Sequence, residues 1–265
     1  AGTGELVASA VIKASVSNGM PDGIFSNLNS SNHHVGVQLV QHDLVKAVGF
    51  TGSIKGGRAL FDLANSRLEP IPVFAEMGST NPIVISEKTL SGKAEFWAEK
   101  IADSILQSAG QFCTSPGLIL AVNSPELDLF SQILTKKIEN KGNELMLGQS
   151  IKDSFIAQKT MMYEQKSTIV LSDKLANKSI YSEPTILTTD GNTFLNNKKL
   201  HEEVFGSFAI IVKCKNRSEL ETIIENLEGQ LTGTLLVDEA ELESYSELIE
   251  NFQYRVGRLI FNGVP

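Results

Sequence analysis

Apolar residues along this chain recur with two spacings, one typical of helices and one typical of strands. Spacings of three and four residues predict helices over residues 4–17, 33–42, 55–67, 92–109, 125–140, 151–165, 219–227 and 240–252. Short apolar runs predict strands over residues 24–28, 47–50, 81–85, 117–122, 168–171, 185–188, 208–212, 232–237 and 257–265. Strands that alternate with helices in this way favour an α/β fold with mainly parallel sheets.

The same pattern suggests how the chain is divided. Pro70 and Pro72 interrupt the helical spacing and lead into an extended segment. We therefore predict a boundary here, with residues 1–75 in one domain and 76–265 in another. In the first domain, the spacing of the opening helix places Leu6, Val7, Ala10, Val11 and Ala14 on one helical face.

Composition narrows the functional class. The 265 residues are 42% hydrophobic, enough for a packed core, and the net charge of −8 argues against a nucleic-acid groove. Two cysteines do not make a disulfide framework and are read as reduced thiols of a cytoplasmic protein. No apolar run reaches the roughly 20 residues that span a bilayer, and no signal peptide is visible. The chain opens without Met, and we expect it to be a fragment of a longer protein.

Cys113 stands in the segment Gly110-Gln111-Phe112-Cys113-Thr114, where the predicted helix 92–109 gives way to a strand. A thiol at such a junction can be partly exposed and still rigidly held, as a nucleophile requires. Free cysteines are also commonly buried and inert. The residues alone leave both interpretations open.

Glu76 is the candidate partner of this thiol. It lies near the predicted domain boundary, in Phe74-Ala75-Glu76-Met77-Gly78, where an acid with a suitable pKa can act as a general base. The alternative is a surface or helix-capping carboxylate. Together, the two segments suggest covalent thiol chemistry assisted by a carboxylate.

Two further segments have the character of ligand sites. Gly52 and Ser53 follow a predicted strand and precede a helix, a junction that either binds phosphate through helix N–H groups or simply makes a turn. Glu202 and Glu203 form either a solvated acidic helix end or part of a cleft. No metal-ligand spacing is present, and we predict no metal site.

Taken in order, these motifs resemble those of the aldehyde dehydrogenase superfamily. The matching segments are Phe50-Thr51-Gly52-Ser53, Glu76-Met77-Gly78-Ser79-Thr80-Asn81-Pro82, Gly110-Gln111-Phe112-Cys113 and Glu202-Glu203-Val204-Phe205-Gly206. Residues 70–79 and 110–117 are similar to the branch of α-ketoglutaric semialdehyde (2,5-dioxopentanoate) dehydrogenases.

The resemblance implies NAD- or NADP-dependent oxidation of a small aldehyde to a carboxylate, in this branch of 2,5-dioxopentanoate to 2-oxoglutarate. Cys113 would attack the aldehyde and carry a thiohemiacetal and then a thioester, and Glu76 would activate the hydrolytic water. The cofactor would contact Ser53 and Gly52 at its pyrophosphate, Glu203 at the nicotinamide ribose and Phe205 beside the nicotinamide ring.

The resemblance also implies what this chain lacks. Residues 1–75 would be the last part of a Rossmann-like cofactor domain, and 76–265 a catalytic domain truncated at its C-terminus. The family's oxyanion Asn and cofactor-ribose Lys would lie before residue 1, so the fragment is expected to be inactive. The parent protein is expected to be a homo-oligomer. Met77-Gly78-Ser79 stands where the family often has Leu-Gly-Gly.

Two alternatives remain. Cys113 could support thioester chemistry without hydride transfer, as in an esterase. The chain could instead be a truncated, non-catalytic relative that acts as a binding or structural module.

Overall fold

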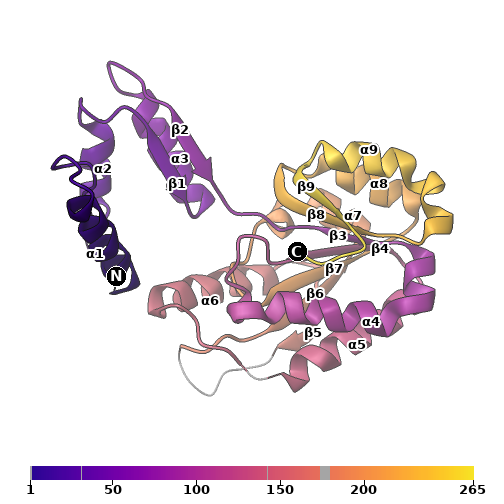
Figure 1. Ribbon diagram of the computed structural model, residues 1–265. Helices are drawn as coiled ribbons and strands as arrows, with labels where there is room; N and C mark the ends of the chain where they lie inside the picture. The colour runs from indigo at the N-terminus through magenta and orange to yellow at the C-terminus, as the bar shows by residue number, and fades with distance from the viewer. Residues whose placement is uncertain (1, 31, 142, 174–179) are drawn as a thin grey trace. The chain divides into compact units, whose positions relative to one another are not determined.

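The chain folds into two units, Ala1–Met77 and Gly78–Pro265. The computed structural model describes residues 2–30, 32–141, 143–173 and 180–265. The division between the units lies close to the boundary predicted after residue 75. Each unit has its own sheet (Figure 1). One cluster of buried apolar side chains lies in the first unit and two lie in the second, and each unit is described by itself.

The first unit is a small parallel arrangement of strands and helices. In chain order it contains α1 (Gly2–Ser17), α2 (His34–Gln41), β1 (Val48–Thr51), α3 (Ile54–Asn65) and β2 (Val73–Glu76). Strands β1 and β2 pair in parallel, with Thr51 opposite Glu76. A small core of Val40, Ala64 and Ile71 lies among these elements.

The predicted opening helix forms as α1, and its apolar face is open: Leu6 is 75% exposed and Val7 59%, and only Ala8 of this helix is buried. Two other predictions for this unit are wrong. Residues 24–28 form no strand, because they pair with no other strand of the described chain, and an apolar run needs such a partner. The strand predicted as buried over 47–50 is only half-buried, with alternating partly covered and exposed positions.

The second unit is built on a seven-stranded sheet with the order β5-β6-β7-β4-β3-β8-β9. All neighbouring strands are parallel except β5 and β6, which are antiparallel. The predicted α/β class with a mainly parallel sheet is therefore confirmed. The strands are β3 (Ile83–Ile85), β4 (Leu118–Val122), β5 (Ile169–Asp173), β6 (Thr185–Asp190), β7 (Phe208–Cys214), β8 (Gln230–Leu236) and β9 (Val256–Phe261).

Helices pack on both faces of this sheet (Figure 1). Strand β4 shows the division, because Leu118 and Leu120 join one apolar cluster and Ile119 and Ala121 the other. The second of these clusters includes α4 (Glu87–Leu106) and α5 (Pro125–Asn140). The first includes α6 (Gln149–Tyr163), α7 (Gly191–Asn196), α8 (Arg217–Asn226) and α9 (Ser246–Gln253).

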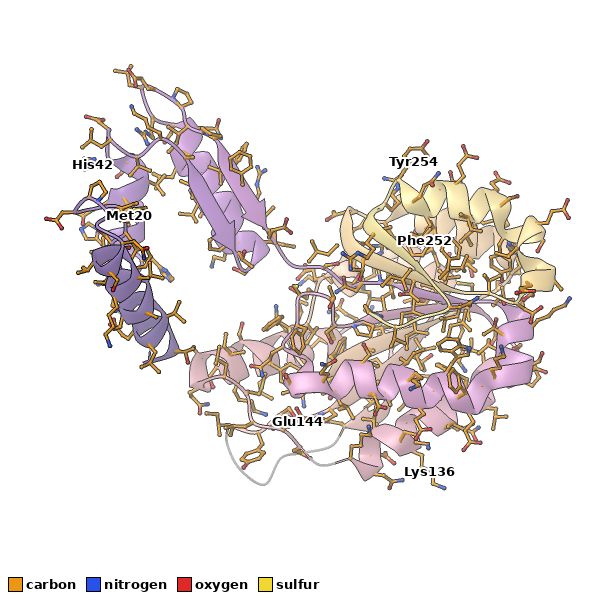
Figure 2. All side chains as sticks on the ribbon, in the orientation of Figure 1. Met20, His42, Lys136, Glu144, Phe252 and Tyr254 are labelled. Atoms are coloured by element: carbon orange, nitrogen blue, oxygen red, sulfur yellow. The ribbon has the colours of Figure 1, made fainter. Side chains whose placement is uncertain are left out.

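The end of α9 shows how sharply inside and outside are separated. Figure 2 shows Phe252 beneath the helix and Tyr254 at the surface, and their exposed fractions are 0% and 79%.

In the described part of the chain, no helix is both long enough and apolar enough to cross a membrane.

The starts of two helices differ most from those predicted. Helix α4 begins at Glu87 rather than residue 92, because the Ser86 side chain accepts a hydrogen bond from the Thr89 N–H and caps the helix. The predicted helix 240–252 is instead two short 3₁₀ turns, Glu239–Glu241 and Glu243–Tyr245, followed by α9. The Asp238 side chain caps the first of these turns.

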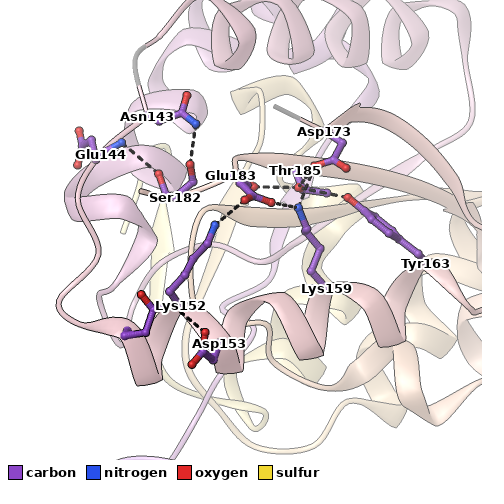
Figure 3. Close-up of polar contacts among 11 residues, drawn as sticks. Asn143, Glu144, Lys152, Asp153, Lys159, Tyr163, Asp173, Ser182, Glu183 and Thr185 are labelled. Atoms are coloured by element: carbon purple, nitrogen blue, oxygen red, sulfur yellow. Dashed lines mark hydrogen bonds and ion pairs between the residues drawn. The ribbon is translucent and has the colours of Figure 1, made fainter. Parts of the chain in front are cut away.

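A buried ionic network ties α6 to the sheet (Figure 3). Lys152 Nζ contacts one oxygen of Glu183 at 2.7 Å, and Lys159 Nζ contacts the other oxygen at 2.7 Å and Asp173 at 2.9 Å. Both lysines are only 4% exposed. Burial opposes ionisation of Glu183, but the hydrogen bonds from the two lysines outweigh it and hold its pKa below the usual value. Likewise, Glu183 and Asp173 overcome the burial of Lys159 and raise its pKa.

Replacing Glu183 by Gln should lower the free energy of unfolding of the second unit by about 3 kcal/mol, because a buried ammonium loses its counter-ion. The matched control is Glu99→Gln, which breaks the more exposed pair between Glu99 and Lys137 and should cost under about 1 kcal/mol. Guanidinium unfolding followed by the fluorescence of Trp97, the single tryptophan, measures both. Equal falls in the free energy of unfolding of the two variants would contradict the interpretation of Glu183 as the counter-ion of buried lysines.

Wild type and Glu183→Gln also differ in how their stability depends on pH. The folded-state pKa of Glu183 lies below its ordinary value of 4.5. The contribution of ionised Glu183 to the free energy of unfolding is therefore complete above pH 4.5 and is lost as pH falls through the folded-state pKa. The stability difference between wild type and Glu183→Gln should be constant above about pH 6 and shrink below about pH 4.

Candidate active site

The predicted site residues of the second unit lie in loops at one edge of its sheet. Cys113 precedes β4, Glu203 and Phe205 precede β7, and β4 and β7 are hydrogen-bonded parallel neighbours. The amino ends of parallel neighbours meet at the same edge, so strand pairing brings these loops together. The structure thus gathers three of the six predicted residues in one place.

The Cys113 thiol is exposed on a tight turn. The Ser115 N–H donates to the Phe112 carbonyl at 3.1 Å, which closes a turn with Cys113 at its second position. Cys214, by contrast, is fully buried in β7, and burial together with the charge of Glu219 raises the pKa of its thiol. Of the two cysteines, Cys113 is the one that a solute can reach.

The turn is anchored at its start by a left-handed stretch of backbone. Ser108, Ala109 and Gly110 have φ values of 50°, 58° and 68°, a conformation that costs non-glycine residues of order 1 kcal/mol or more. The Glu144 carboxylate accepts the Ala109 N–H at 2.9 Å and so supports this stretch. A Cβ at Gly110 would overlap the backbone of Gly206. The loops of Cys113 and Phe205 therefore meet backbone against backbone.

Glu203 and Phe205 flank a small enclosed space. The Glu203 carboxylate lies against Gly78, where a Cβ would collide with it. Burial raises the pKa of Glu203, partly offset by a hydrogen bond from the Ser79 backbone. The Phe205 N–H donates to Gln158 Oε1 at 3.3 Å. The enclosed space measures about 10 Å³, close to the smallest cavity that holds one water molecule.

The other three predicted residues lie together in the first unit. Gly52 and Glu76 stand at the carboxyl ends of β1 and β2, where the Gly52 N–H donates to the Glu76 carbonyl at 3.0 Å. Ser53 caps α3, because its Oγ accepts the Gly56 N–H at 3.1 Å. The space left by the missing side chain at Gly52 is filled by the ring of Phe50. The pairing of Glu76 with Cys113 stays a prediction.

Asn81 belongs to one of the motifs quoted from the sequence, but the sequence assigned it no role. Asn81 is 1% exposed, and its amide donates to the carbonyls of Cys113 and Ser115, each at 2.9 Å. An Asn-Pro pair before a buried strand does signal a turn. Its partners across the sheet are not readable from the sequence.

Among the described residues, no group of three or more His, Cys, Asp or Glu side chains could hold a metal ion.

Comparison with known proteins shows which family this chain resembles. The profile of the aldehyde dehydrogenase family matches residues 1–263. An α-ketoglutaric semialdehyde dehydrogenase of Acinetobacter baylyi is 37% identical over 265 residues, which is 99% of this chain and 50% of that protein. The chain spans about half the length of the curated relatives it matches.

Solved structures share the fold. A 1-pyrroline-5-carboxylate dehydrogenase superposes with a TM-score of 0.80 at 18% identity and covers 98% of this chain and 51% of its own. The glyceraldehyde-3-phosphate dehydrogenase GapN of Methanocaldococcus jannaschii, complexed with NADP, gives a TM-score of 0.76 at 20% identity and covers 97% and 54%. The fold expected from the four motifs is confirmed, and the chain belongs to the aldehyde dehydrogenase family.

Proposed function

We propose that this chain carries the nucleophile of an NAD(P)-dependent aldehyde dehydrogenase whose substrate is 2,5-dioxopentanoate, with 2-oxoglutarate as the product. The observation that carries the proposal is the contrast between the two thiols: Cys113 is exposed on an anchored turn, and Cys214 is sealed in the core. The 37% identity to an α-ketoglutaric semialdehyde dehydrogenase supports the choice of substrate.

In the first step, the Cys113 thiolate attacks the aldehyde carbon. A carbon–sulfur bond forms, the carbonyl π pair moves to oxygen, and protonation of that oxygen gives a thiohemiacetal. Backbone N–H groups of the Cys113 turn are the donors that we assign to the developing charge. Fixed donors of this kind often supply the largest single contribution to catalysis.

The final step is assigned to Glu76. As a general base it removes a proton from water, the water oxygen attacks the thioester carbon, and the carbon–sulfur bond breaks to give a carboxylate and the free thiol. General-base catalysis of this kind contributes roughly 10²–10⁴-fold. The exposed position of Glu76 at the end of β2 leaves its carboxylate accessible to water.

The residues present fit a nicotinamide dinucleotide in two places. Helix α3 begins at the Ser53 cap, and the N–H groups of its first turn suit a pyrophosphate. The half-buried Glu203 carboxylate can accept hydrogen bonds from ribose hydroxyls, and Phe205 can lie beside the nicotinamide. When bound, NAD(P) supplies the oxidant, because it accepts the hydride that converts the thiohemiacetal to the thioester.

Substitution of Cys113 by Ala in a polypeptide of the relatives' full length should abolish aldehyde-dependent NAD(P)H formation, because no thiohemiacetal can form. Glu76→Gln should slow steady-state turnover by about 10²-fold and retain a first-turnover burst of NAD(P)H, because it affects only hydrolysis. Cys214→Ala is the matched control and should keep its turnover. Full activity of Cys113→Ala, or its loss in Cys214→Ala alone, would refute the assignment.

The 265-residue chain by itself should show little or no turnover in the same assay. The family resemblance assigns one oxyanion donor to a residue outside this chain, and loss of one such donor costs about 10²–10³-fold. Absorbance of NAD(P)H at equal protein concentration compares the chain with the longer polypeptide. Comparable rates would show that this chain holds the complete site.

A further inference from the structure

Asn81 occupies an unusual position for a side chain with no assigned role. It is 1% exposed, directly precedes Pro82 and β3, and has a φ of 46°. The left-handed region is costly for most side chains, and Asn is one of the few that enter it. Such strain persists only where the surroundings hold the residue firmly.

The Asn81 amide reaches the nucleophile turn from the inner side. Nδ2 donates to the Cys113 carbonyl and to the Ser115 carbonyl, both at 2.9 Å. Oδ1 accepts from Thr232 in β8, at 3.2 Å from its N–H and 2.9 Å from its hydroxyl. Because the amide oxygen is fixed by the sheet, the amide nitrogen is aimed at the two carbonyls.

Ser79 buttresses Asn81. Its Oγ accepts the Asn81 N–H at 3.2 Å and the Leu231 N–H at 3.0 Å. Its single proton serves Gln230 Oε1 at 2.9 Å or Asn81 Oδ1 at 3.0 Å. The hydroxyl thus stands where the glycine frequent in the family would offer no such contacts.

The direction of two peptide groups follows from these bonds. In a trans peptide, the C=O and N–H point to opposite sides. The Phe112 carbonyl accepts a hydrogen bond from the Ser115 N–H, so the Cys113 N–H of the same peptide group points away from Ser115. The Cys113 carbonyl accepts a hydrogen bond from the Asn81 amide, so the Thr114 N–H of that peptide group points away from the interior. Neither N–H donates to a residue in the described ranges.

We infer that Asn81, supported by Ser79, is a positioning residue that holds the Cys113 turn and so directs the Thr114 N–H, next to the Cys113 N–H, toward the oxyanion formed when Cys113 attacks a carbonyl. The inference rests on the proposed role of Cys113 as nucleophile. Asn81 touches neither substrate nor cofactor and acts through the peptide groups of the turn.

Two reagents applied to the 265-residue chain separate this role from general support. With p-nitrophenyl acetate, the Cys113 sulfur attacks the carbonyl carbon, the π pair moves to oxygen as an oxyanion, and collapse expels p-nitrophenolate to leave a thioester. With iodoacetamide, the sulfur displaces iodide from a CH₂ carbon, and no oxyanion forms. Only the first reaction needs the aimed N–H groups.

The expected result is a selective loss. Asn81→Ala and Asn81→Asp should lower the rate constant for Cys113 acylation by about tenfold to hundredfold and change that for alkylation less than threefold. Ser79→Ala should cause a smaller loss of the same kind. The matched control is Ser131→Ala, which removes a buried hydroxyl bonded to the Leu127 carbonyl in α5 and should leave the ratio of the two rates unchanged.

Each outcome decides a separate question. Equal falls in both rates, or no fall in either, would overturn the role of Asn81. A wild-type Cys113 acylated no faster than the thiols of the unfolded chain would instead overturn its proposed role as nucleophile. Trp97 fluorescence reports whether each variant is folded. If both Asn81 variants fail to fold, Ser79→Ala alone decides, and an unchanged ratio there refutes the inference.

Discussion

The candidate site of the second unit depends on the contact between the backbones of Gly110 and Gly206. A Cβ at Gly110 would overlap the Gly206 backbone, so the loop before β4 and the loop before β7 approach each other with no side chain between them at this point. One loop carries Cys113 and the other carries Glu203 and Phe205. Strand pairing sets the approximate distance between the loops, and the two glycines set the final one. The left-handed backbone at 108–110 is the conformational cost of this contact.

The position of the loops in the second unit departs from a general expectation. Ligands of open parallel sheets usually bind at the carboxyl ends of the strands. In the first unit, Gly52, Ser53 and Glu76, for which we propose ligand roles, lie at that end, since they end or follow β1 and β2. In the second unit, Asn81, Cys113 and Phe205 all lie before the strands they lead into. Their rigidity therefore comes from hydrogen bonds between loops and neighbouring strands, as between Asn81 and Thr232.

Local signals in the sequence were enough for much of the fold. Helix α5 runs from Pro125 to Asn140 as predicted, because the Ser124 cap and a proline at the first turn mark its start. Residues 24–28 failed as a strand, since an apolar run does not reveal whether a partner strand exists. The motifs singled out Cys113 and Glu203, and the pairing of β4 with β7 brings their loops together. The role of Asn81 was missed because it depends on Thr232, 151 residues away.

The central claim is that Cys113 is an accessible thiol on an anchored turn and Cys214 a sealed core thiol. Alkylation of the folded chain by iodoacetamide, followed by intact mass and peptide mapping, tests it directly. The account predicts one fast label on Cys113, with Cys214 protected until the chain is unfolded by guanidinium. Slow and equal labelling of both cysteines in the folded chain would contradict it.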